Sequence, residues 1–249
     1  MRHNLKFFAL GLTGLLLAGA APLPDYVASA VNAPVRHADK IKDASRHGAE
    51  IVAFMGLKPG QKIADFLPGR GYWTRIFSGV VGQQGHVFDI WPSLMVTPGS
   101  KFEKTMTALS HQSGITNVTA LQVHLPSLNL PEPVDVFFTS QNLHDLPTPF
   151  LGNTDITAFS KQVFAALKPG GKFVVIDHVA AAGAGLTQTD TLHRIEPDTA
   201  RKAILAAGFT FAGESSLLAN PQDNHHLKVF DSKIRGKTDQ FIYVFVKPE

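Results

Sequence analysis

The stretch Asp65-Phe66-Leu67-Pro68-Gly69-Arg70-Gly71 decides how the rest of the sequence is interpreted. Residues 62–66 predict a strand, and residues 72–81 predict a helix. The loop that joins them therefore lies at the carboxyl end of a strand, where open α/β sheets bind their ligands. Its glycines let the backbone approach a ligand closely, and the first turn of the helix offers free N–H groups. A plain strand–helix turn explains the same residues, so the loop alone does not decide between the two.

Strands and helices alternate on both sides of this loop. Predicted strands cover residues 62–66, 86–91, 118–123, 134–139, 172–177, 209–215 and 240–246. Predicted helices cover residues 38–57, 72–81, 101–110, 156–167 and 196–207. Near-continuous apolar strands separated by helices indicate a parallel sheet that is covered on both faces. The last two strands have no helix between them, which predicts an antiparallel final strand.

The fold prediction is therefore a Rossmann-like, doubly wound α/β sheet of seven strands, mostly parallel, with an antiparallel last strand. We place it in one domain over residues 38–249. Residues 21–37 contain three prolines and small side chains, and we expect them to form an irregular N-terminal arm.

Residues 1–20 have the pattern of a secretory signal peptide. Arg2 and Lys6 are their only charges, residues 7–17 are almost wholly apolar, and Ala18-Gly19-Ala20 supplies small side chains for cleavage. We predict cleavage after Ala20 and export, most simply to the periplasm. An uncleaved anchor is the alternative, although the apolar run is short for a bilayer span. A second small-residue site lies at Ala28-Ser29-Ala30.

Composition excludes several classes of site and partner. The 249-residue chain has no cysteine, which rules out a lipoprotein anchor, disulfides and thiolate metal sites. The formal net charge is +3 without any basic tract, so we expect no nucleic-acid partner. We expect no membrane span once the signal peptide is removed. The oligomeric state stays open.

A nicotinamide dinucleotide is the first cofactor to consider for a glycine-containing loop of this kind. Its fingerprint requires a third glycine for close packing of the helix on the strand. Three residues after Gly71 the chain has Thr74. The sequence therefore argues against this cofactor and against an oxidoreductase.

The order of motifs resembles a class I S-adenosylmethionine-dependent methyltransferase over about residues 38–247. The motifs that carry this resemblance are Leu57-Lys58-Pro59-Gly60, the Asp65–Gly71 loop, and Leu167-Lys168-Pro169-Gly170-Gly171. The chain is more similar still to a family of predicted exported methyltransferases of unknown substrate. The residues of that closer match are Tyr72-Trp73-Thr74-Arg75, Gln141-Asn142-Leu143-His144-Asp145-Leu146, Asp177-His178, Leu192-His193-Arg194-Ile195 and Arg235-Gly236-Lys237-Thr238-Asp239.

The resemblance implies S-adenosylmethionine as cofactor and a small-molecule acceptor. It also implies cofactor-binding roles for a set of loop and strand-end residues: Asp65, Pro68, Gly69, Gly71, Tyr72, Asp89 and Asn142. Asp65 would face the charged amino-acid part of the cofactor. Two positions depart from the family pattern. Leu67 replaces the first glycine of the loop, and Trp91 stands where an acidic residue would hold the ribose, with Asp89 two residues earlier on the same face.

Three histidines follow strands that end at the same edge of the predicted sheet. His144, His178 and His193 are the catalytic candidates, because imidazole exchanges protons near neutral pH. Arg194 is the candidate acceptor contact. No HxH or HxxxH spacing supports a metal site, so we expect none. His225 and His226 lie in the insertion before the last strand, and we interpret them as a solvated loop.

The sequence thus predicts methyl transfer from S-adenosylmethionine to an unidentified acceptor. A second interpretation is a non-catalytic ligand-binding protein on a degenerate methyltransferase fold. It is motivated by the predicted export, since S-adenosylmethionine is made in the cytoplasm, and by Leu67 and Trp91. A different α/β enzyme is the third.

Overall fold

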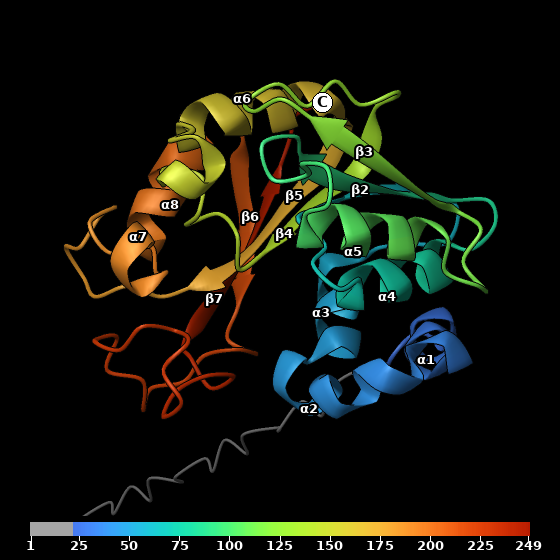
Figure 1. Cartoon of the computed structure of the whole chain (residues 1–249), viewed down its shortest axis with the longest axis horizontal. Helices are drawn as coiled ribbons and strands as arrows, with labels where there is room; N and C mark the ends of the chain where they lie inside the picture. The colour runs from blue at the N-terminus through green and yellow to red at the C-terminus, as the bar shows by residue number, and fades with distance from the viewer. Residues whose placement is uncertain (1–21) are drawn as a thin grey trace, which may run out of the picture.

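The computed structural model describes residues 22–249, which form a seven-stranded sheet with helices on both faces (Figure 1). The strands are β1 (Lys62–Phe66), β2 (His86–Pro92), β3 (Val118–Val123), β4 (Val134–Ser140), β5 (Leu167–His178), β6 (Thr210–Ser215) and β7 (Gln240–Val246). Their order in the sheet is β3-β2-β1-β4-β5-β7-β6. Neighbours from β3 to β5 are parallel, and β7 is antiparallel to both β5 and β6. The predicted Rossmann-like sheet and its antiparallel last strand are confirmed.

The helical elements cover both faces of this sheet. They are α1 (Asp25–Asn32), η1 (Pro34–Lys42), α2 (Asp43–Arg46), α3 (Gly48–Met55), α4 (Tyr72–Val81), α5 (Lys101–Ser110), η2 (Pro149–Leu151), α6 (Ile156–Ala166), α7 (Thr189–Leu192) and α8 (Pro197–Leu205), the η elements being 3₁₀ helices. None of the helices within residues 22–249 is long and apolar enough to span a membrane. The predicted signal peptide, residues 1–20, lies outside the described residues.

Side chains of one strand alternate between the two cores, as the pleat requires. Phe137 of β4 packs with Phe159 of α6 and Ile204 of α8 in one buried cluster. Its neighbour Phe138 lies in the cluster on the other face of the sheet, with residues of α1, α3 and α4. These two apolar layers hold the parallel strands in register, so the carboxyl ends of β1 and β4 meet at one edge of the sheet.

Residues 22–37 are mostly helical, whereas the sequence predicted an irregular arm over this stretch. The prolines lie where helices tolerate them: Pro24 is the N-cap of α1, and Pro34 is the first residue of η1. Val27 and Ala30 on α1 are buried in the core cluster that contains α4. Helix α1 is therefore part of the packed domain.

The predicted helix over residues 38–57 is divided into η1, α2 and α3. His47 interrupts it, because its backbone has a left-handed φ of 47° between α2 and α3. Gly48 follows at a close approach to α4. A Cβ atom there would lie 2.6 Å from the Tyr72 hydroxyl. The chain therefore turns at His47 and brings α3 against α4.

The segment between β6 and β7 confirms the predicted long loop. Residues 216–239 consist of turns and irregular backbone. This segment crosses the carboxyl edge of the sheet, because Val179 at the end of β5 donates a backbone hydrogen bond to Asp239, and Val229 donates one to Leu192. It thereby brings side chains from the end of the chain over the ends of β4 and β5.

Candidate functional site

A cavity of about 500 Å³ lies at the carboxyl edge of the sheet. Loops that follow four strands supply its wall: Leu67 and Gly69 after β1, Met95 after β2, Asn142 after β4 and His193 after β5. Phe230 of the 216–239 segment lies on the far side. The cavity thus occupies the edge at which the sequence placed the ligand, next to the point where β1 lies between β2 and β4.

The glycine loop borders this cavity without filling it. Gly69 has a left-handed φ of +57°, and no atom lies within 4 Å of a Cβ built on it. Asn142 braces the loop, because its Nδ2 donates to the Ser140 carbonyl at 2.7 Å and to the Leu67 carbonyl at 3.3 Å. The loop therefore leaves an open surface of backbone toward the cavity.

Strained backbone gathers at this cavity. Leu67, Gln141 and His193 have φ values of 56°, 64° and 56°, which non-glycine residues rarely adopt, and all three line the wall. Leu67, which replaces the first glycine of the pattern that the chain resembles, has a left-handed conformation. Such residues cost about 1–3 kcal/mol each and concentrate at functional sites. The sequence offered no signal for Gln141 or His193 being strained.

Two buried carboxyl groups lie beneath the glycine loop. Thr74 Oγ1 is 3.0 Å from Asp65 Oδ2 and 3.0 Å from Asp89 Oδ1. A hydroxyl donates one proton, so the second contact is a hydrogen bond only if a carboxyl group carries a proton. Burial raises the pKa of Asp65 to about 7. Burial and the nearby Asp65 charge raise the pKa of Asp89 well above its ordinary value.

The structure separates the predicted cofactor residues into three groups. Gly69 and Asn142 line the cavity. Asp65 and Asp89 are 1% and 0% exposed and lie below its wall. The remaining three are packing residues of the loop and of α4: Pro68, Gly71 and Tyr72.

Tyr72 and Gly71 lie outside the cavity wall and contact neighbouring helices. The Tyr72 hydroxyl donates to Asp43 at 2.8 Å, and its ring lies against the guanidinium groups of Arg36 and Arg46. A Cβ atom on Gly71 would lie 2.3 Å from Leu109 of α5. Both residues therefore hold neighbouring elements together.

Trp91, which the resemblance places where an acidic residue would hold the ribose, lies in the cavity wall. Its ring is 1% exposed, and its Nε1 has no hydrogen-bond partner among the described residues. Sequence analysis identified Trp91 as the end of the strand but did not assign it to the site. Most of the other wall residues that were missed are apolar and carry no chemical signal: Met95, Phe102, Phe150, Val229 and Phe230.

Asp177 at the end of β5 organises the histidine side of the cavity. Its carboxylate is fully buried and accepts from His144 Nδ1 at 2.7 Å, from the His144 amide at 2.8 Å and from the His178 amide at 2.7 Å. Burial disfavours its charge, but His144 outweighs burial, and the pKa of Asp177 falls below its ordinary value. Asp177 therefore fixes the loop after β4 to the end of β5.

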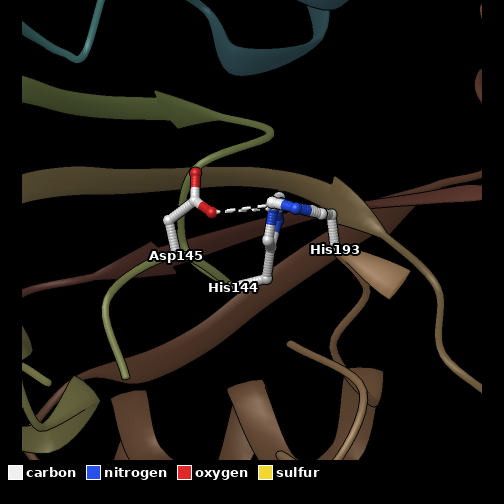
Figure 2. Close-up of side chains that lie close together, drawn as sticks. All are labelled: His144, Asp145 and His193. Carbon is white, nitrogen blue, oxygen red and sulfur yellow. Dashed lines mark hydrogen bonds and ion pairs between the residues drawn. The ribbon is translucent and has the colours of Figure 1, made fainter. Parts of the chain in front are cut away.

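His144, Asp145 and His193 form a compact group in the cavity wall, which we call the His144 cluster (Figure 2). His144 Nε2 lies 3.3 Å from His193 Nδ1 and 3.2 Å from Asp145 Oδ1. His193 Nδ1 lies 3.4 Å from the same oxygen. Both histidines are among the predicted catalytic residues, and Asp145 belongs to the quoted motif after β4.

The charge state of His144 follows from its two acidic neighbours. Burial opposes a positive imidazole, but Asp177 and Asp145 outweigh it and raise the pKa of His144 to about 10. Burial and the nearby His144 charge lower the pKa of His193. Without a bound ion, His144 thus carries a proton on each ring nitrogen at neutral pH and donates rather than accepts.

His178 reaches the same wall from the end of β5. Its Nδ1 lies 2.8 Å from the Thr238 hydroxyl. Burial lowers the pKa of His178 to about 4, so the ring is neutral. The structure therefore brings together the three predicted histidines, each in a different electrostatic environment.

Arg194 does not reach the cavity. Its side chain is fully buried, and its guanidinium lies 2.9 Å and 3.1 Å from the two carboxylate oxygens of Asp223. It also donates to the carbonyls of Val179 and Leu227. This arrangement ties the 216–239 segment to the chain beside His193, so we correct the predicted acceptor contact to a positioning role.

A second hollow, of about 350 Å³, adjoins the cavity. The two share Gln141, His178, Val229 and Phe230. Three cationic side chains line it: Lys42, Arg46 and Arg235. Burial and the neighbouring Arg46 charge lower the pKa of Lys42. The hollow therefore offers positive charge next to the histidines.

Comparison with known proteins identifies the fold. The chain matches no family model. It is 32% identical over 125 residues to the ubiquinone/menaquinone biosynthesis C-methyltransferase UbiE of Vibrio parahaemolyticus. The aligned region covers 49% of the chain and 43% of that protein. The chain thus spans less than half the length of this curated relative.

Solved structures support the same fold. An S-adenosylmethionine-dependent methyltransferase of Aquifex aeolicus superimposes with a TM-score of 0.56 at 17% identity, over 86% of the chain and 99% of that protein. Fibrillarin of Aeropyrum pernix, solved with natively bound S-adenosylmethionine, superimposes with a TM-score of 0.51 at 13% identity. The match covers 82% of the chain and 76% of that protein. The chain has the class I methyltransferase fold and is a distant homologue of methyltransferases such as UbiE.

The buried Arg194–Asp223 pair can be tested by unfolding. Arg194→Met leaves Asp223 buried and unpaired, so we expect a loss of about 3–5 kcal/mol in the free energy of unfolding. Lys168→Met breaks a surface pair with Asp135 and should cost no more than about 1 kcal/mol. Urea unfolding followed by circular dichroism measures both. Equal costs would argue against the positioning role of Arg194.

The buried carboxyl pair predicts a specific pH dependence. The raised pKa of Asp65 means that the folded state keeps a proton which the unfolded chain loses near pH 4. The free energy of unfolding therefore falls as the pH rises from about 4 toward 7. Asp65→Asn removes the titration. Between pH 5 and 7 the wild-type protein should lose stability relative to the variant by about 1.4 kcal/mol per pH unit. Parallel stability curves would contradict the assignment.

Proposed function

We propose that this protein transfers a methyl group from S-adenosylmethionine to a small-molecule acceptor. The observation that carries the proposal is the cavity at the carboxyl edge of a class I methyltransferase fold, bordered by an open glycine loop. Distant homology to UbiE-like methyltransferases supports it. When bound, the cofactor supplies an electrophilic methyl group on a sulfonium, and the protein binds and aligns its two reactants.

The residues of the cavity fit such a cofactor. The open face of Gly69 leaves room for a ligand along the backbone, and Trp91 offers an aromatic wall for a planar base. Asn142, which already braces the loop, lies in the wall beside it. An ionised Asp65 beneath the loop would attract a cationic ligand without touching it.

The histidine side and the adjoining hollow would receive the acceptor. Lys42, Arg46 and Arg235 make that hollow positive, which favours an acceptor with an anionic group. His178 and Gln141 lie in the walls of both spaces and would contact both reactants. The catalytic roles of His144, His178 and His193 belong to this proposal.

We also propose that the protein acts after export, following cleavage at Ala20. Helix α1 supports this position over the second small-residue site. Cleavage after Ala30 would remove Val27 and Ala30, which are 0% and 3% exposed in the core. Cleavage after Ala20 leaves the whole of α1 in the mature chain.

A non-catalytic ligand-binding role is the second candidate. The strained Leu67 and the Trp91 ring occupy positions where the family pattern has a glycine and an acid, and both line the cavity. These side chains would narrow the space for the cofactor and remove a ribose ligand. Direct measurement of cofactor binding separates the two candidates.

Calorimetric titration of residues 21–249 with S-adenosylmethionine and S-adenosylhomocysteine tests the proposal. We expect binding near 1 μM, or about −8 kcal/mol. Gly69→Leu should weaken both affinities at least tenfold, because the new side chain enters the cavity. Gly60→Leu is the matched control, since Gly60 also has a left-handed φ, of +79°, and open space around its Cβ, but lies outside the cavity wall.

Binding of both ligands that survives in the Gly60 variant and is lost in the Gly69 variant would justify a screen of anionic acceptors. A folded wild-type sample that binds neither ligand would overturn the enzymatic proposal in favour of the ligand-binding role. Equal weakening in the two glycine variants would show that the strain of the substitution, rather than the cavity, controls binding.

The export proposal predicts a defined mature N-terminus. The full chain with a carboxyl-terminal tag, expressed in a Gram-negative bacterium, should appear in the periplasmic fraction beginning at residue 21. Ala18→Lys places a charge at the cleavage motif and should leave the longer form at the membrane. Intact mass measurement reads both forms. A full-length product confined to the cytoplasm would contradict the proposal.

A further inference from the structure

The His144 cluster contains a buried oxygen with no hydrogen-bond partner. Asp145 is 8% exposed, and its Oδ1 makes no hydrogen bond to any of the described residues. The oxygen points toward two imidazole nitrogens of the same cluster (Figure 2). The charge of His144, 3.2 Å away, is the partner of this oxygen when no ion is bound, but it makes no hydrogen bond to it, so the oxygen keeps the capacity to bind a cation.

We propose that His144 Nε2, His193 Nδ1 and Asp145 Oδ1 bind one divalent metal ion of the zinc class. The donor set of two imidazoles and one carboxylate is typical of metal sites that keep a position open for a further ligand. The three side chains come from the loop after β4 and from the residue that follows α7. Tertiary structure, rather than a short sequence motif, therefore brings them together.

The spacing of the three atoms matches tetrahedral coordination. Bonds from zinc to imidazole nitrogen and carboxylate oxygen are about 2.0–2.2 Å, which places neighbouring ligand atoms of a tetrahedron about 3.3–3.6 Å apart. The distances within the cluster are 3.2, 3.3 and 3.4 Å. The ligand atoms thus already stand close to one face of the coordination shell.

Asp177 supplies the support that a metal-binding histidine needs. Its carboxylate accepts from His144 Nδ1 at 2.7 Å, which orients the ring and directs Nε2 toward the cluster. Metal-bound histidines usually donate their other ring nitrogen to a carboxylate or carbonyl in this way. The second hydrogen bond, from the His144 amide at 2.8 Å, restrains the backbone as well.

The fourth coordination position would open into the cavity, because all three ligand residues line its wall. Phe230 lies beside the site in the same wall, with its ring centroid 4.8 Å from that of His193. An ion there would take an oxygen or nitrogen atom of a molecule in the cavity as its further ligand. This role rests on the proposed function and would narrow the acceptor to molecules with such an atom, whereas the metal site itself does not depend on it.

A hydrogen-bonded cluster without metal is the competing explanation for the same distances. A proton on His144 Nε2 can be donated to His193 Nδ1, and Asp145 Oδ1 is then held by its ion pair with the His144 ring at 3.2 Å, without a hydrogen bond. One metal ion bonds all three atoms at once. The two explanations therefore differ in a measurable quantity, the binding of one ion per chain.

The experiment titrates chelator-treated residues 21–249 with Zn²⁺ alone, and then with Co²⁺ as a spectroscopic probe. We expect one Zn²⁺ per chain by elemental analysis, submicromolar affinity in a competition assay, and the intense visible absorption of tetrahedral Co²⁺. His193→Gln and Asp145→Asn should each weaken Zn²⁺ binding at least tenfold, and Asp177→Asn by about 10–100-fold. His226→Gln removes an exposed histidine and should change nothing.

Circular dichroism and thermal unfolding show whether each variant folds, and His193 is the safest ligand to replace because its side chain is 22% exposed on a loop. Binding at a ratio below one per chain, or affinity that is unchanged in both His193→Gln and Asp145→Asn, would overturn the metal site. These measurements use no cofactor or acceptor. Zinc binding can therefore be absent while S-adenosylmethionine binds, and zinc can bind while S-adenosylmethionine does not, so the two proposals fail separately.

Discussion

The buried carboxylate of Asp177 is the constraint on which the geometry of the site depends. It accepts three hydrogen bonds, two from His144 and one from the His178 amide, and no part of it meets solvent. Satisfying a buried charge with three donors avoids the cost of leaving it unpaired. The same bonds fix the loop after β4 against the end of β5. Two strands of a rigid sheet thereby position one imidazole.

The remaining walls of the cavity combine rigid strands with strained loop backbone. Leu67 and Gln141 follow β1 and β4 directly in left-handed conformations, and hydrogen bonds from Asn142 and to the Ile176 carbonyl hold them there. The apolar layers on both sides of the sheet provide the stability that offsets this strain. A loop that relaxed to an ordinary turn would lose the open backbone at Gly69.

Much of this arrangement could be predicted from the sequence, because it depends on local pattern. Residues 72–81 and 101–110 form helices as predicted, and the apolar strand 134–140 lies at the centre of the sheet. The helices α1 and η1 were missed, since prolines at helix starts look the same in a sequence as prolines in a coil.

The predicted site residues also divide into those with a local sequence signature and those whose contacts arise only on folding. The three histidines and Gly69 were found because strand ends and glycine turns have local signatures. Arg194 was given the wrong role, because its partner Asp223 lies in a distant segment that only the folded chain brings near. The contact of His144 and Asp145 with His193 was missed for the same reason: contact between side chains of separate loops leaves no spacing rule in the sequence.

The N-terminal helices connect this site to the start of the chain. Arg36 is fully buried, donates to the Val31 carbonyl at 2.5 Å and to Asp43 at 2.6 Å, and lies against the Tyr72 ring. Asp43 in turn accepts from Tyr72 at the start of α4. These contacts place Lys42 and Arg46 over the hollow beside the histidines. The segment that follows the predicted signal peptide therefore supplies two of the three cationic side chains of the proposed acceptor site, Lys42 and Arg46. Processing that removed α1 would disturb this site as well as the core.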